Sequence, residues 1–257
     1  QQTTTKLGAQ EIHAIGQREL TRLRAEMESV MREIGRELKF DGDFAAFVKH
    51  LSTEPKFFHT SPESLLAGYR DIAKRLDAEM PKLFAELPRA PYGVQPMPPH
   101  MGANRAEYYN GPALDGSRGG TFFANALSFK RRPIWAMETL VAHETVPGHH
   151  LQVARAAELK NLPPFRRLGG YTAFSEGWAL YAETLGFDLG LYSDPHSRFG
   201  HLQAQAFRAA RLVTDTGIHA LGWSRQQAID FMVERTGQDR EFISGEIDRY
   251  TSMPGQA

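Results

Sequence analysis

One stretch restricts the possible folds and reactions of this chain more than any other, namely His143-Glu144-Thr145-Val146-Pro147-Gly148-His149-His150. In the common zinc-hydrolase pattern His-Glu-x-x-His, two histidines four residues apart share one face of a helix and bind one metal ion. Here Pro147 stands where the second ligand should be. On a regular helix His149 would point about 120° away from His143, and His150 would lie about 10 Å further along the axis. A regular helix therefore cannot build this site.

Pro147 and Gly148 supply a cause for a local distortion. Proline has no N–H to donate to the carbonyl of His143, and glycine tolerates unusual dihedral angles. A bulge that loops out the two extra residues would bring His149 to the ligand position. The sequence therefore predicts a helix that is broken between Glu144 and His149.

A catalytic zinc site needs a third protein ligand and keeps a fourth position for water. The helical run 174–183 offers two glutamates on one face, separated by two turns. Glu176 is the predicted ligand. Glu183 is expected either to accept a hydrogen bond from a ligating imidazole or to form a structural ion pair. Glu144 is the predicted general base, which takes a proton from the attacking water and passes it to the leaving amine.

The remaining sequence reads as mainly helical. Apolar residues spaced three and four apart predict a helix at about 11–38, and a second helix is predicted at 62–79, with Ser61 as N-cap and Pro62 in the first turn. A proline- and glycine-rich segment at 88–120 precedes a strand at 121–125, which we expect to be an edge strand able to pair with substrate backbone. Further helices are predicted at 133–159, with a disturbance near Pro147, and at 171–187, 195–221, 224–236 and 240–250.

Composition excludes several classes of function. The 30 basic and 30 acidic side chains cancel, so no long-range field recruits nucleic acid or acidic lipid. The absence of cysteine excludes disulfides, thiolate metal sites and thiol nucleophiles, so histidine and carboxylate would have to hold any metal. No apolar run approaches the roughly 20 residues that span a bilayer. The compartment stays open between cytoplasmic and periplasmic or secreted.

Five strings across the chain resemble the bacterial DUF885 family. They are His-Glu-Thr-Val-Pro-Gly-His-His-Leu-Gln at 143–152, Ser-Glu-Gly-Trp-Ala-Leu-Tyr-Ala-Glu at 175–183, Asp-Gly-Ser-Arg-Gly-Gly-Thr-Phe-Phe at 115–123, Asp-Thr-Gly-Ile-His-Ala-Leu-Gly-Trp-Ser at 215–224 and Arg-Tyr-x-x-x-Pro-Gly-Gln-Ala at 249–257. The resemblance implies a mainly α, gluzincin-like zinc metallopeptidase fold with a small β-sheet beside the active-site helix. It is more distantly similar to peptidases with His-Glu-x-Gly-His or His-Glu-x-x-Gly-His motifs, and this comparison favours His149 over His150 as ligand.

Members of the family are usually longer, so the resemblance implies a fragment of a longer chain. We expect 1–257 to form a single catalytic region, with a helical segment at 1–87, an irregular and β segment at 88–132 and a helical zinc-binding segment at 133–257.

Weaker candidates complete the expected site. His219 and Tyr250 lie in the family strings and are predicted donors to the oxyanion of the reaction, a role open to His150 as well. Arg118 and Arg211 are candidates for binding a substrate carboxylate. The alternative for each is a packing residue or one that ties loops together.

The expected function is a zinc-dependent peptidase acting on short peptides. One alternative is a zinc amidohydrolase that acts on non-peptide amides or conjugated amino acids, and another is a metal-binding module without catalysis. Nitrogen and oxygen ligands also admit manganese, cobalt or iron. The expected partner is a peptide or amide substrate, with no nucleic acid and no membrane span, and the oligomeric state is left open.

Overall fold

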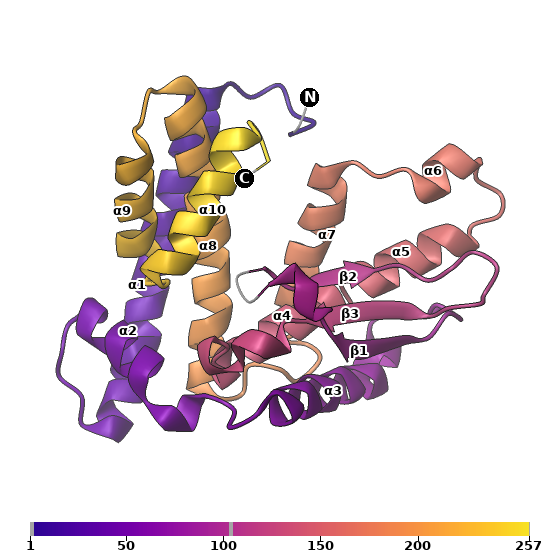
Figure 1. The fold of residues 1–257 in the computed structure, drawn as a ribbon, viewed down its shortest axis with the longest axis horizontal. Helices are drawn as coiled ribbons and strands as arrows, with labels where there is room; N and C mark the ends of the chain where they lie inside the picture. Colours follow the sequence, from indigo (N-terminus) through magenta and orange to yellow (C-terminus); the bar gives the residue numbers. More distant parts are fainter. Residues whose placement is uncertain (1–2, 103–104, 257) are drawn as a thin grey trace. The chain divides into compact units, whose positions relative to one another are not determined.

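The computed structural model describes residues 3–102 and 105–256 (Figure 1). The chain divides into two compact units. The terminal unit consists of Gln1–Glu54 and Arg198–Ala257, and the central unit consists of Pro55–Ser197. The N-terminal and C-terminal segments thus belong to one unit. The expected single catalytic region with segments at 1–87, 88–132 and 133–257 stays a prediction. Ala257, the last residue of the C-terminal family string, lies outside the described residues.

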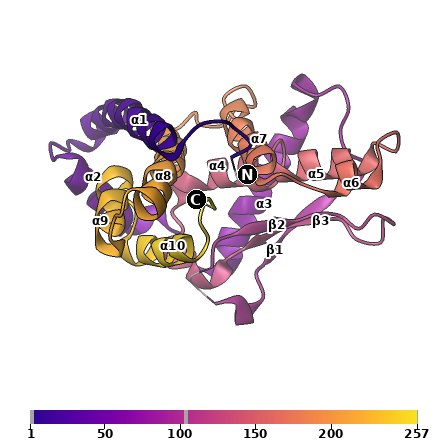
Figure 2. The same ribbon diagram turned by 90° about the horizontal axis from the view of Figure 1, so that it is seen from above.

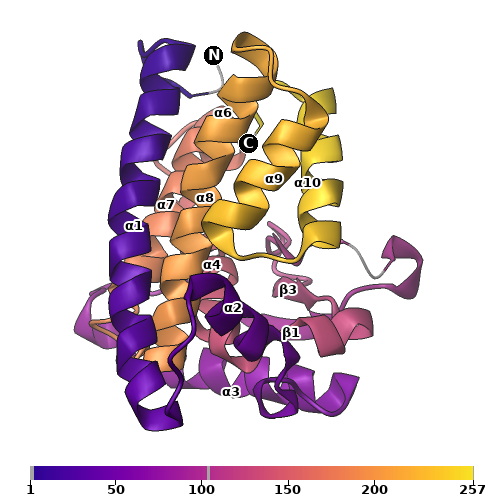
Figure 3. The ribbon, with the colours of Figure 1, turned by 90° about the vertical axis from the view of Figure 1, so that its left-hand side faces the viewer.

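The terminal unit is helical. Its helices are α1 (Ala9–Leu38), α2 (Phe44–Thr53), α8 (Pro195–Ala220, which begins in the central unit), α9 (Arg225–Thr236) and α10 (Arg240–Ser252). Figure 3 shows α1, α8, α9 and α10 running alongside one another. A Cβ atom on Gly16 of α1 would lie 2.7 Å from Val213 and 2.8 Å from the carbonyl of Ala209, both on α8, so glycine permits the close approach of these two helices.

The central unit combines helices with a small sheet. Its elements are α3 (Pro62–Glu79), β1 (Tyr92–Pro96), β2 (Tyr108–Asn110), β3 (Gly120–Ala124), α4 (Met137–Glu144), α5 (His149–Glu158), α6 (Pro164–Leu168) and α7 (Thr172–Leu185), with short 3₁₀ turns between them. The strand order is β1-β3-β2, with β1 parallel and β2 antiparallel to β3. Figures 1 and 2 show α5 beside this sheet.

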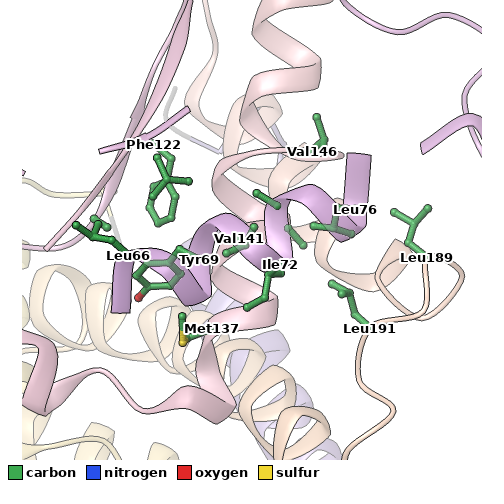
Figure 4. Close-up of a cluster of buried hydrophobic side chains, with 14 of the residues drawn as sticks. Leu66, Tyr69, Ile72, Leu76, Phe122, Met137, Val141, Val146, Leu189 and Leu191 are labelled. Atoms are coloured by element: carbon green, nitrogen blue, oxygen red, sulfur yellow. The ribbon is translucent and has the colours of Figure 1, made fainter. Parts of the chain in front are cut away.

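The core of the central unit lies where α3, β3 and α4 meet. Figure 4 shows apolar side chains from three sources converging there, namely Leu66, Tyr69, Ile72 and Leu76 of α3, Phe122 of β3, and Met137 and Val141 of α4. Helix α3 contacts both β1 and α4, and α4 in turn contacts α7. The helix that carries His143 is therefore held on two sides by buried packing.

The structure confirms a mainly helical chain with a small sheet, and most predicted helices lie within two residues of their expected ends. Ser61 caps α3 as predicted, because its side chain accepts a hydrogen bond from the backbone N–H of Ser64 at 3.1 Å. The short helices α2 and α6 were not predicted. In α2 the capping aspartate, Asp43, was a local signal that could have revealed the helix.

The edge-strand prediction for 121–125 is wrong. Strand β3 is the middle strand, with Phe122 paired to Val94 of β1 on one side and to Tyr109 of β2 on the other. Its backbone groups are therefore used within the sheet. In the described part of the chain, none of the helices has the length and apolar character that crossing a membrane requires.

Candidate metal centre

The predicted helix break is present. Helix α4 ends at Glu144 and α5 begins at His149. Thr145 closes α4, since both its N–H and its hydroxyl donate to the carbonyl of Val141, at 2.9 and 2.6 Å. Its own carbonyl then accepts the N–H of His150 at 2.9 Å. The backbone groups freed by the break are thus partly satisfied within the break itself.

Gly148 has a φ of −77° and a ψ of −129°, which lie in neither the helical nor the extended region, in line with the predicted use of glycine's dihedral tolerance. The close approach of two backbone segments is a second reason for glycine here. A Cβ atom at this position would lie 1.9 Å from the carbonyl oxygen of His143 and 2.4 Å from that of Ala142. The chain passes so close to the end of α4 that no side chain fits.

Trp178 ties the break to α7. Its indole N–H donates to the carbonyl of Pro147 at 2.9 Å. Trp178 lies two residues after Glu176 on α7, and Pro147 lies two residues before His149. One hydrogen bond therefore joins the segments that carry two of the predicted ligands.

The break brings His143, Glu144 and His149 together. One potential ligand atom from each residue lies within 4.8 Å of those of the other two. The two imidazole rings are nearly perpendicular, with centroids 4.7 Å apart. His143 and Glu144 are buried, with 3% and 6% of their surface exposed.

Glu176 of α7 faces the same pair of histidines. One carboxylate oxygen lies 3.5 Å from Nε2 of His143, and the other lies 3.8 Å from Nε2 of His149. Its side chain is 42% exposed, so the site opens to the surface on this side.

Glu183, two turns further along α7, contacts the opposite nitrogen of His143. Nδ1 of His143 donates to its carboxylate at 2.7 Å, and both side chains are buried. This bond places the proton on Nδ1 and leaves the lone pair of Nε2 directed toward Glu176. The contact expected between Glu183 and an imidazole is therefore present.

The donor set fits a small divalent ion. Two atoms that each lie about 2.0–2.2 Å from a tetrahedral ion are about 3.4 Å apart. Each oxygen of Glu176 lies near this distance from one imidazole, Oε2 at 3.5 Å from His143 and Oε1 at 3.8 Å from His149. Glu144 is the second carboxylate at the site, but it follows His143 directly on α4, and adjacent residues on a helix point in directions about 100° apart. Glu144 nevertheless has a carboxylate oxygen within 4.8 Å of ligand atoms of both histidines, so the assignment of Glu176 as the third ligand stays a prediction.

His150 is used differently from His149. Its Nδ1 accepts a hydrogen bond from the hydroxyl of Tyr109 at 2.8 Å, and its Nε2 donates to the carbonyl of Ala90 at 3.0 Å. Burial lowers the pKa of this imidazole to about 4. With both nitrogens engaged, His150 anchors α5 to β2 and to the segment before β1, which supports His149 as the ligand.

Tyr109 is a site residue that the sequence analysis missed. Besides binding His150, its ring lies 6.5 Å from that of His149 at an interplanar angle of 25°. A Cβ atom on Gly120 of β3 would lie 2.4 Å from its hydroxyl, so the glycine pair before β3 leaves room for this contact. The pairing of β2 with β3 creates the arrangement, and no local pattern around Tyr109 signals it.

The two arginine candidates bind backbone carbonyls. Arg118 donates to the carbonyls of Gly119 and Gly111 at 2.9 and 2.7 Å, which closes the loop between β2 and β3. Arg211 belongs to the terminal unit and is buried, and it donates to the carbonyl of Gln256 at 3.0 Å. Burial lowers the pKa of this guanidinium. A role for either arginine in binding substrate stays a prediction.

His219 and Tyr250 also lie in the terminal unit, where they contact each other. Nε2 of His219 donates to the carbonyl of Tyr250 at 3.0 Å, and the hydroxyl of Tyr250 donates to Glu246 at 2.8 Å. Tyr250 is fully buried, and burial raises the pKa of its hydroxyl. Their predicted roles as oxyanion donors stay predictions.

Comparison with known proteins identifies relatives over the whole chain. The family described as "Bacterial protein of unknown function (DUF885)" matches residues 1–257. None of the curated proteins matches the sequence.

Two solved structures have the same fold. A "putative lipoprotein" from Colwellia psychrerythraea has a TM-score of 0.94 and 36% sequence identity, over 100% of this chain and 44% of that one. A "putative lipoprotein of unknown function" from Shewanella oneidensis has a TM-score of 0.81 and 18% identity, over 99% of this chain and 48% of that one. The chain therefore spans less than half the length of either protein, and the second likeness concerns the fold alone.

Proposed function

The chain belongs to the DUF885 family of bacterial proteins of unknown function, and from the geometry of its site we propose that it is a zinc-dependent peptidase. The proposed ligands are His143, His149 and Glu176. The observation that carries the proposal is the approach of one carboxylate to Nε2 of both histidines, at 3.5 and 3.8 Å, across a helix break that the regular zinc-hydrolase pattern lacks. A gluzincin-like fold belongs to the same proposal.

Zinc bound there would polarise a carbonyl oxygen of the substrate and lower the pKa of a bound water molecule. Glu144 is the group that accepts a proton from the attacking water and delivers it to the leaving nitrogen. Its buried position beside His143 suits this task, because a carboxylate held at the site needs no rearrangement to take the proton. Glu183 keeps the proton of His143 on Nδ1 throughout.

Short peptides are the proposed substrates. Hydrolysis of conjugated amino acids would use the same attack of water on an amide carbonyl. The substrates that the protein cleaves therefore decide between the two classes. We expect a peptide library to be cleaved by the full-length protein, and a panel of N-acyl amino acids to be cleaved much less well. The reverse preference would replace the peptidase with an amidohydrolase.

The decisive test is Glu144→Gln in the full-length protein. We expect turnover to fall at least about 100-fold while zinc content, measured by elemental analysis, is retained. Glu158→Gln is the matched control, because it also replaces a glutamate with glutamine. Glu158 lies on α5 and pairs with Arg155 and not with the proposed ligands, so this variant should leave turnover unchanged. Full turnover in Glu144→Gln, or no bound metal in the parent protein, would refute the proposal.

A further inference from the structure

Tyr192, which follows α7 in the chain, is buried between the helices that carry the proposed ligands. Its hydroxyl donates to the backbone carbonyl of Glu183 at 2.9 Å and is bonded to the hydroxyl of Thr139 at 2.9 Å. Because the tyrosine proton goes to the carbonyl, the threonine is the donor in the second bond. The phenol thus joins α4 to α7 through two hydrogen bonds.

These bonds lie directly beside the contact between His143 and Glu183. Thr139 is one helical turn before His143 on α4, and Glu183 supplies both its backbone carbonyl to Tyr192 and its carboxylate to His143. The two helices are therefore connected twice within one turn, once through Tyr192 and once through the imidazole. Any shift of α7 along α4 would strain both connections.

The backbone of Tyr192 gives independent support. Its φ of +62° is in the left-handed region, which is unfavourable for a residue with a side chain and in which glycine would be more comfortable. Its N–H donates to the carboxylate of Glu138 at 2.8 Å, and Glu138 is paired with Arg75 of α3 at 3.0 Å. A Cβ atom on Gly186 would lie 2.6 Å from the tyrosine ring, so the turn after α7 leaves space for it. Tyr192 therefore occupies this position although its left-handed backbone conformation is unfavourable for a tyrosine.

Given the proposed zinc site, on which this inference rests, we propose that Tyr192 is a positioning residue. It sets the orientation of His143 toward the metal by fixing Glu183 against α4. It touches neither metal nor substrate. Burial raises the pKa of its hydroxyl, so the phenol stays protonated and remains a donor.

The test is zinc affinity in the full-length protein. Removal of a partner that contacts a ligand directly, as in Glu183→Gln, should weaken zinc binding about 10- to 100-fold. Tyr192→Phe and Thr139→Val act one contact further away and should each weaken it about 3- to 10-fold. Since both remove parts of the same connection, the double variant should bind hardly more weakly than either single variant.

Thr214→Val is the control, and it is matched to Thr139→Val. It removes another buried threonine hydroxyl, which lies on α8 in the terminal unit and donates to the carbonyl of Ala210 at 3.1 Å. Its zinc affinity should equal that of the parent within about twofold. The visible spectrum of bound Co²⁺, which reports on ligand geometry, should change in Tyr192→Phe and not in Thr214→Val.

Parent-like zinc affinity in Tyr192→Phe, or an equal loss in Thr214→Val, would overturn the positioning role while leaving the zinc site intact. Failure of the parent protein to bind zinc would instead overturn the proposed function, and the role of Tyr192 with it. Circular dichroism at the temperature of the titrations confirms that each variant compared is folded.

Discussion

Gly148 shows how a single residue makes the candidate site possible. Two chain segments meet there more closely than any side chain allows, and this approach puts His149 beside His143. His149 and His150 carry the same side chain, so their roles differ because of the atoms that surround each imidazole. His150 binds Tyr109 and Ala90 through its two nitrogens, whereas Nε2 of His149 faces Glu176.

Gly148→Ala should therefore damage both stability and metal binding. The added Cβ would lie 1.9 Å from a backbone carbonyl, so the break must open. We expect the free energy of unfolding to fall by at least about 1–3 kcal/mol. Zinc affinity should fall with it, because His149 moves relative to His143. Chemical denaturation and zinc titration measure the two effects.

The control is Gly245→Ala on α10, where nothing lies within 4 Å of the added atom. This helical substitution should stabilise the protein by about 0.5–1 kcal/mol. If Gly148→Ala were as harmless as the control, the close approach at the break would not exist.

Among the elements, α7 does most to assemble the site. It contributes Glu176 to the proposed ligands, Glu183 to His143 and Trp178 to the carbonyl of Pro147. These residues lie on a helix that contacts both α4 and α5. The two short helices on either side of the break are thus held by one longer helix.

Trp178→Phe should loosen the break without removing any proposed ligand. It keeps an aromatic ring but removes the donor to Pro147, which should cost about 1 kcal/mol of stability. The amide of His150, which donates to Thr145 across the break, should exchange its hydrogen faster. Hydrogen exchange followed by mass spectrometry on peptides that span 145–150 measures this.

Trp223→Phe provides the comparison for this variant. Trp223 lies in the terminal unit, where its ring packs against His13 and Phe231. It should leave exchange at 145–150 unchanged. Unchanged exchange in Trp178→Phe would show that the indole does not hold the break.

In the molecule as a whole, the two compact units contain different parts of the expected site. Every proposed zinc ligand lies in the central unit, whereas His219, Tyr250 and Arg211 lie in the terminal unit. A metal ion held by three elements of one unit would stabilise that unit in proportion to its affinity.

Zinc at 100 times its dissociation constant should stabilise the central unit by about 2.7 kcal/mol. Hydrogen exchange with and without zinc should show this protection in α4, α5 and α7. A chelator should reverse it, and His143→Ala should abolish it. Magnesium, which prefers oxygen ligands, should give little protection. Equal protection by magnesium and zinc would argue against a site built on imidazole nitrogens.

Local features of the sequence predicted much of this arrangement. The apolar periodicity predicted the long helices, Ser61 predicted the start of α3, and Pro147 with Gly148 predicted the break between Glu144 and His149. Such features depend on contacts between residues that are close in sequence, so the order of the side chains is enough to predict them. The family resemblance favoured His149 over His150 as ligand, and the family itself is confirmed.

Contacts between distant segments needed the tertiary structure. The middle position of β3, the union of both terminal segments in one unit, the contact of Tyr109 with His150 and the contact of Tyr192 with Thr139 all join residues far apart in sequence. The physical reason is that hydrogen-bond donors and acceptors are present along the whole chain, so their pairing depends on which helices and strands pack together. Pro147 and Gly148 could predict that the helix breaks. Only the packing of α7 and the sheet against that break decided that His149 faces Glu176 while His150 faces Tyr109.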